Sequence, residues 1–259
     1  MANGQWLTAK KTMALILAIE TGTDICSVAL VRDGELVALR ESDEERNHAS
    51  TIAPFVDELL RECGVRPSDL EAIAVSKGPG SYTGLRIGVS FAKGLCYALQ
   101  IPLLAIGSLA SLIEVAREDY EAGIVDVECW SEATLCPMID ARRMEVYTQT
   151  FNAEGVAKSD VEAKIIDESS FVEEREQGAL VIFGSGAKKC CEVLAGATFV
   201  DVVPSARGMA RLAEEAFVEG KTEDVAYFEP FYLKDFMVGT AKKSLLERVT
   251  ENGKRKAEN

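Results

Sequence analysis

Residues 13–32 read MALILAI, ETGTD and ICSVALVR in turn, and the architecture of the chain can be worked out from them. Two apolar runs of strand length around a short polar segment predict a pair of antiparallel strands. Asp33-Gly34 is a further turn signal, so residues 35–41 can form a third antiparallel strand. The chain therefore opens on a three-stranded meander, and its first turn follows an acid, Glu20.

The same pattern returns later in the chain. Residues 134–139 are typical of a strand, Asp140-Ala141-Arg142-Arg143 of a turn, and residues 144–151 of a second strand. Glu20 and Asp140 each end the first strand of their hairpin with an acid, which indicates an internal duplication. We therefore expect two related α/β lobes, with the acidic stretch 118–132 as the boundary between them.

Apolar spacing between the two hairpins predicts two helices. Residues 50–63 carry apolar side chains at helical intervals, and Gly64 follows as a C-terminal cap. A strand at 70–76 and the glycine-rich segment 78–84 lead into a second helix at 85–99. Further strands are expected at 101–106 and 179–183, and further helices after Ser108, from residue 187 to Leu194 and after Ser205.

The second helix is apolar or small on both sides. One stripe holds Leu85, Val89, Ala92, Cys96 and Leu99, and the other holds Ile87, Phe91, Gly94 and Ala98. Gly84, Gly88 and Ala92, spaced by four, leave one face nearly bare, where another helix could approach closely. Each helical glycine costs roughly 1 kcal/mol relative to alanine, so a packing or functional return is expected. A partner-binding face and a helix enclosed in its own lobe fit this pattern equally well.

Composition restricts the classes of partner and compartment. The chain has 28 Lys and Arg against 42 Asp and Glu, a net charge of −14, so it would repel phosphate backbones unless its cations were segregated. Cations do exceed acids from Lys234 onward, in a tail typical of solvated segments. The seven cysteines have no C-x-x-C spacing, which favours reduced thiols and a cytoplasmic location. No apolar run has membrane-spanning length, so no membrane association is expected.

Two glycine-bearing turns after strands are candidate phosphate loops. Backbone N–H groups at a strand-to-helix turn can hold an anion, although a helix-capping loop is an equally good interpretation. The segment 78–84 is neither a Walker A motif nor a dinucleotide fingerprint. The candidate phosphate-binding residues are Thr21, Gly22, Thr23, Gly78, Gly80 and Ser81. Because few cations lie beside them, we expect weak or no nucleotide binding by the chain alone.

Four motifs in this order carry a family resemblance: LAIETGT at 17–23, GPGSYTGLRIG at 78–88, IDARRMEVY at 139–147 and EPFYLK at 229–234. Together they resemble the bacterial TsaB (YeaZ) family over roughly residues 13–250. The resemblance implies an actin/Hsp70-like (ASKHA) fold. Its two lobes would span 13–117, with the partner-binding helices, and 118–240, with peripheral tails at 1–12 and 241–259.

The resemblance also implies a function. TsaB is an accessory, noncatalytic subunit that pairs with its paralogue TsaD and supports threonylcarbamoyl transfer to the adenosine next to the anticodon of tRNA. The implied partners are TsaD, a TsaE-type ATPase in the full complex, a second copy of the chain when alone, and tRNA only through the complex. No cofactor is expected on the chain alone, and ATP or ADP could bind at the interface with TsaD.

One histidine separates this chain from the catalytic paralogue. TsaD carries His-x-x-x-His at the start of a helix as metal ligands, whereas here the fourth residue after His48 is Ile52, and His48 is the only histidine in the chain. A single imidazole cannot supply that pair. We therefore expect no metal ligands and no catalytic residues. The expected interface residues are His48, Ile52, Phe55, Leu59, Gly84, Gly88, Phe91 and Ala92.

Two alternatives from other classes remain open. An autonomous actin-like ATPase or small-molecule kinase would usually carry an Asp at the first turn, where this chain has Glu20. A glycoprotease-like peptidase would need the missing metal ligands. Both are weaker than the subunit hypothesis, which the two-sided apolar helix supports.

Overall fold

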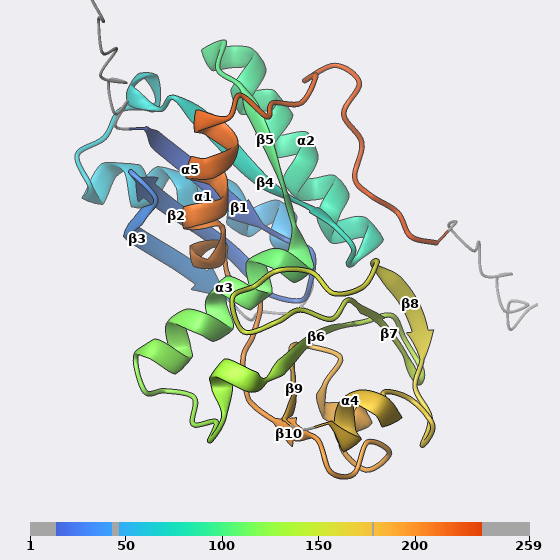
Figure 1. The fold of residues 1–259 in the computed structure, drawn as a ribbon. Helices are drawn as coiled ribbons and strands as arrows, with labels where there is room; N and C mark the ends of the chain where they lie inside the picture. The colour runs from blue at the N-terminus through green and yellow to red at the C-terminus, as the bar shows by residue number, and fades with distance from the viewer. Residues whose placement is uncertain (1–13, 43–46, 178, 235–259) are drawn as a thin grey trace, which may run out of the picture.

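The computed structural model describes residues 14–42, 47–177 and 179–234. They form two lobes, each built on a five-stranded sheet (Figure 1). The strand orders are β3-β2-β1-β4-β5 and β10-β9-β6-β7-β8. The expected tails, 1–12 and 241–259, and the basic segment after Lys234 lie outside the described residues.

The first sheet is a meander extended by two parallel strands. β1 (Leu15–Glu20) pairs antiparallel with β2 (Cys26–Arg32), which pairs antiparallel with β3 (Glu35–Ser42). On its other edge β1 pairs parallel with β4 (Ala72–Gly78), and β4 pairs parallel with β5 (Leu103–Gly107). The predicted strands of this lobe are therefore confirmed to within about two residues at their ends.

The two faces of this sheet bury different side chains because successive residues of a strand point to opposite sides. Leu15, Leu17 and Ile19 pack on the side of α1 (His48–Glu62) and α2 (Tyr82–Leu99). Ile16 and Ala18 face the other side, which is covered by the 3₁₀ turn η4 (Ala206–Met209) and α5 (Ala210–Val218). The chain thus returns to the first lobe at its end.

The second lobe repeats the plan of the first. β6 (Thr134–Asp140) pairs antiparallel with β7 (Glu145–Thr148), and β7 pairs antiparallel with β8 (Glu162–Ile165). β6 also pairs parallel with β9 (Leu180–Phe183), which is followed by β10 (Thr198–Phe199). Strand by strand this is the order of the first sheet, so the internal duplication and the two-lobe actin-like fold are confirmed.

Three expectations about boundaries need correction. The expected boundary at 117/118 falls inside α3 (Ser108–Glu121), and the apolar side of that helix belongs to the core of the second lobe. The C-terminal lobe, expected at 118–240, does not include α5, because that helix packs on the first sheet. The helix expected up to Leu194 is only a 3₁₀ turn, η3 (Lys188–Cys190), followed by turns. So short a segment gains too few hydrogen bonds to propagate a helix.

Three short elements complete the chain: the 3₁₀ turns η1 (Pro67–Asp69) and η2 (Trp130–Glu132) and the helix α4 (Val172–Glu176). Among the residues described here, no helix is both long enough and apolar enough to cross a membrane.

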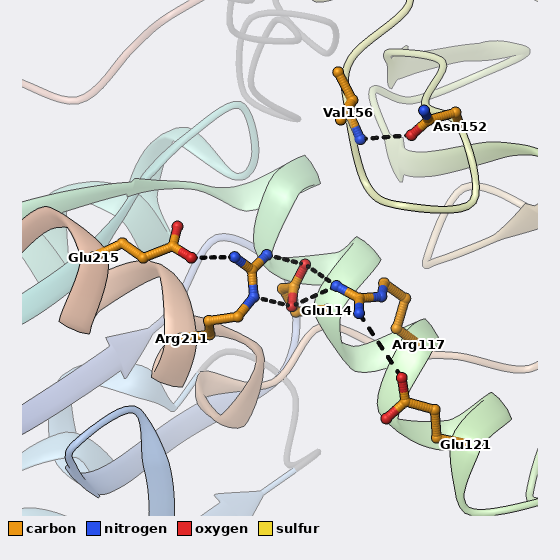
Figure 2. Close-up of polar contacts among 7 residues, drawn as sticks. All are labelled: Glu114, Arg117, Glu121, Asn152, Val156, Arg211 and Glu215. Atoms are coloured by element: carbon orange, nitrogen blue, oxygen red, sulfur yellow. Dashed lines mark hydrogen bonds and ion pairs between the residues drawn. The ribbon is translucent and has the colours of Figure 1, made fainter.

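An ion-pair network joins α3 to α5 (Figure 2). The Glu114 carboxylate, only 8% exposed, accepts hydrogen bonds from Nε and Nη2 of Arg211 at 2.9 and 2.7 Å. Arg117, one turn along α3, donates to the same carboxylate at 3.3 Å. Because α5 covers the first sheet and α3 packs in the second core, these contacts help hold the lobes in one arrangement.

Candidate functional site

The two candidate phosphate loops lie against each other at the carboxyl ends of β1 and β4. The Ser81 N–H donates to the Gly22 carbonyl at 2.6 Å, and a Cβ on Gly80 would lie 2.3 Å from that oxygen. The Gly22 N–H donates to Glu20 Oε1 at 2.5 Å. Two backbone donors that a phosphate at these loops could use, the N–H groups of Gly22 and Ser81, are therefore engaged within the chain itself.

The glycine ridge of α2 packs on the first turn. A Cβ on Gly84 would lie 2.0 Å from the Thr21 carbonyl oxygen, and one on Gly88 would lie 2.2 Å from Thr21 Oγ1. Thr21 Oγ1 donates to the Gly84 carbonyl at 2.9 Å, and Ala92 is fully buried. The expectation that Gly84, Gly88 and Ala92 form a bare face for a partner is wrong, because the hairpin turn covers Gly84 and Gly88, and Ala92 lies in the core of the first lobe.

Of the interface residues expected on α1, His48 and Leu59 are buried within the lobe, whereas Ile52 is nearly buried but lines the groove described below. The His48 ring is 7% exposed, and its Nε2 donates to the Thr23 carbonyl at 2.7 Å, which ties the start of α1 to the first turn. Ile52 and Leu59 lie in the core under α1, at 2% and 0% exposure. Among the described residues no group of three or more metal-ligating side chains is gathered.

Glu20 lies buried beneath these loops, at 1% exposure. Burial raises the pKa of its carboxyl from 4.5 to about 7, although the hydrogen bond from the Gly22 N–H acts in the opposite direction. Its Oε2 atom and the nearby hydroxyl of Ser108 are buried without a hydrogen-bond partner among the described residues. Ser108 was expected to cap α3 but begins it instead, with Gly107 in the capping position. A neutral Glu20 suits this buried position better than an ionised one.

A groove between α1 and α2 remains open on this side of the first lobe. It has a volume of about 640 Å³ and is lined by Ala49, Ile52, Tyr82, Thr83, Arg86, Ile87, Ser90 and Phe91. Ile87 and Phe91 are half-buried, as is Phe55 on α1, while Gly94 and Ala98 are exposed farther along α2. The open face of α2 is therefore its second apolar stripe, which periodicity detects but does not distinguish from the glycine ridge.

The last described segment covers the glycine-rich loop. The Phe231 N–H donates to the Lys77 carbonyl at 2.7 Å, and the Phe231 carbonyl oxygen would lie 2.7 Å from a Cβ on Gly78. The rings of Tyr232 and Tyr82 have centroids 4.7 Å apart, at the mouth of the groove. The EPFYLK and GPGSYTG motifs, far apart in the sequence, thus form one surface.

Comparisons with known proteins match this chain to two related groups, the TsaD transferases and the TsaB proteins. The family model described as TsaD, tRNA N6-adenosine threonylcarbamoyltransferase, matches residues 42–176. A transferase of that name from Nitratidesulfovibrio vulgaris is 41% identical to this chain, but the alignment covers only 41% of this chain and 34% of the transferase. The tRNA threonylcarbamoyladenosine biosynthesis protein TsaB of Escherichia coli is 32% identical, over 85% of this chain and 94% of its own.

A solved structure gives the same result. The structure of YeaZ from Pseudomonas aeruginosa superposes with a TM-score of 0.69 at 28% identity, covering 85% of this chain and all of that one. The match to TsaB proteins extends over both lobes, whereas the match to the transferase is confined to part of the chain. This chain therefore belongs to the TsaB (YeaZ) family of tRNA threonylcarbamoyladenosine biosynthesis proteins.

Proposed function

We propose that this chain is a noncatalytic subunit that binds TsaD through the groove between α1 and α2 and thereby supports threonylcarbamoyl transfer to tRNA. The observation that carries the proposal is the half-buried apolar stripe of Ile87 and Phe91 beside that groove. Apolar side chains left partly open along a helix pair are stabilised when a complementary surface covers them.

The relation between the two families supports this choice of partner. The model of the TsaD family matches residues 42–176, a range that contains both α1 and α2. A paralogue with the same helix pair can offer a similar surface, so the two chains can pack around a pseudo-twofold axis. For the same reason we propose that the chain pairs with itself when TsaD is absent.

The noncatalytic role rests on the chemistry of the loops. His48 binds a backbone carbonyl, and Ile52 lies in the core where a second imidazole would be needed. Glu20, the acid of the first turn, is buried beneath the Gly22 turn and hydrogen-bonded to it. With these groups used internally, we propose that the transfer reaction takes place on TsaD, and that free nucleotide binds this chain weakly.

The test combines one groove variant with a matched control. Ile87→Glu places a charge in the groove, whereas Ile165→Glu places the same charge on β8, where the side chain is already 70% exposed. Ile87→Glu should lose co-elution with purified TsaD and should lose tRNA modification in the reconstituted system. Ile165→Glu should retain both.

Two results would contradict the proposal. One is a folded Ile87→Glu protein that still supports full modification. The other is threonylcarbamoyl transfer to tRNA by this chain without TsaD, which would make the chain itself the catalyst.

A further inference from the structure

The turn between β6 and β7 holds two arginines in an unfavourable backbone conformation. Arg142 has φ of +71° and Arg143 has φ of +51°, a region that glycine and asparagine enter much more easily. Both side chains are exposed, and within the described part of the chain no acid pairs with either guanidinium. Local strain of this kind is typically retained where the side chains have a function.

A second turn brings more cations to the same place. β6 and β9 are parallel, so their carboxyl ends meet at one edge of the sheet. There the Asp140 N–H donates to Ser185 Oγ at 3.2 Å, and the Gly186 N–H donates to the Met138 carbonyl at 2.8 Å. Lys188 and Lys189 follow directly in η3. Ligands of open α/β sheets bind outside this edge, where the chain leaves neighbouring strands in different directions.

Charge at this edge is opposite to that of the whole chain. Arg142, Arg143, Lys188 and Lys189, which we call the basic edge, lie beside two carboxylates that lysines already neutralise. Asp140 pairs with Lys189, and Glu145 pairs with Lys234 from the last described segment. Although the chain has a net charge of −14, three exposed cations at this edge, Arg142, Arg143 and Lys188, have no ion pair within the described residues. The segregation that an acidic protein needs to approach a polyanion is therefore present.

We propose that the basic edge is an RNA-binding surface that contacts the phosphate backbone. Arginine guanidinium groups match phosphate oxygens in a bidentate geometry, and exposed cations along an open edge suit an extended polyanion. A nucleoside triphosphate, by contrast, binds in a concave pocket that buries most of its surface, whereas Arg142, Arg143 and Lys188 all lie at exposed positions. The inference goes beyond the proposed function, because a scaffolding subunit need not contact RNA at all.

The experiment measures binding of the full chain, without TsaD, to fluorescently labelled unmodified tRNA by anisotropy over a series of salt concentrations. The test variant is R142G/R143G, which removes both guanidinium groups and relaxes the backbone. Its affinity should fall at least tenfold at low salt, and the slope of log affinity against log salt should become shallower by about two. Its thermal unfolding midpoint should rise, because glycine adopts positive φ without strain.

The matched control removes two exposed arginines elsewhere. R61Q/R66Q makes the same change in net charge on α1 and the loop after it, and should bind RNA within twofold of the original chain. The proposal is overturned if the original chain shows no saturable RNA binding, if R142G/R143G binds equally well, or if both variants lose affinity equally. It is also overturned if ATP at equal phosphate concentration displaces the RNA stoichiometrically, since the edge would then be a nucleotide site.

Discussion

The hydroxyl of Thr21 occupies the space that a side chain at Gly88 would need, since a Cβ there would lie 2.2 Å from Oγ1. The contact joins the first hairpin turn to the middle of α2 within the first lobe. The helical glycine therefore has a packing role inside the monomer. Because Gly88 does not line the groove between α1 and α2, a substitution there should affect the stability of the lobe and not the groove surface directly.

Replacing Gly88 should therefore destabilise the monomer. We expect Gly88→Ala to lower the free energy of unfolding by about 1–3 kcal/mol, because a buried methyl group would have to displace the hairpin turn. Chemical denaturation checks this. Gly94→Ala is the matched control on the same helix: nothing lies within 4 Å of its Cβ position, so it should stabilise the chain by up to about 1 kcal/mol.

A double-mutant cycle identifies the cause. In a Thr21→Ala background the Oγ1 atom is absent, and the cost of Gly88→Ala should shrink measurably. Equal costs in both backgrounds would show that the contact with Thr21 is not what excludes a side chain at position 88. Gly88→Arg should unfold the lobe rather than merely separate it from a partner.

Stability should depend on pH through Glu20. The unfolded carboxyl loses its proton near pH 4.5, whereas the folded one retains it up to about 7. Between these values the folded state binds more protons, so the Glu20 contribution is fully present below about pH 4.5 and is lost as the pH rises to about 7. The difference of two to three pKa units corresponds to about 3 kcal/mol.

Glu20→Gln isolates this effect, since a neutral amide can still accept the hydrogen bond from Gly22. Relative to the original chain, the variant should gain up to about 3 kcal/mol of unfolding free energy between pH 5 and pH 8. A stability difference for Glu20→Gln that does not change with pH would contradict the raised pKa.

The link between α3 and α5 should be measurable at Arg211. Arg211→Met removes two hydrogen bonds from the nearly buried Glu114 carboxylate and leaves only the longer contact with Arg117. We expect a loss of about 1–3 kcal/mol in unfolding free energy. Arg211→Met combined with Glu114→Leu should recover part of the loss, because the nearly buried Glu114 carboxylate, which has lost its Arg211 partner, is then absent. If the double variant is less stable than the single one, the contact of Glu114 with Arg117 by itself outweighs the cost of burying the carboxylate.

Local patterns account for much of the first lobe. Apolar runs predict β1, β2, β4 and β5, because these strands are largely buried between the layers that cover the sheet. β3 has no buried position and is predicted instead from the Asp33-Gly34 turn that precedes it. β8 and β10 are missed: β8 is a four-residue strand with two exposed positions, and β10 has only two residues, so neither has a recognisable apolar pattern. The helix α5 is predicted, but its packing on the first sheet is not, because an amphipathic pattern does not specify which sheet a helix covers.

The strands of the first lobe, the repeat of its hairpin in the second lobe and the four family motifs can all be recognised from the amino-acid sequence, because each depends on residues that are neighbours along the chain. The open stripe of α2 can be identified only in the folded chain, since both stripes have helical spacing and the difference lies in Thr21, about sixty residues away along the chain. Only in the folded chain, too, do the cations of residues 142–143 and 188–189 share one edge. That placement follows from the parallel pairing of β6 and β9, a long-range contact that no local pattern encodes.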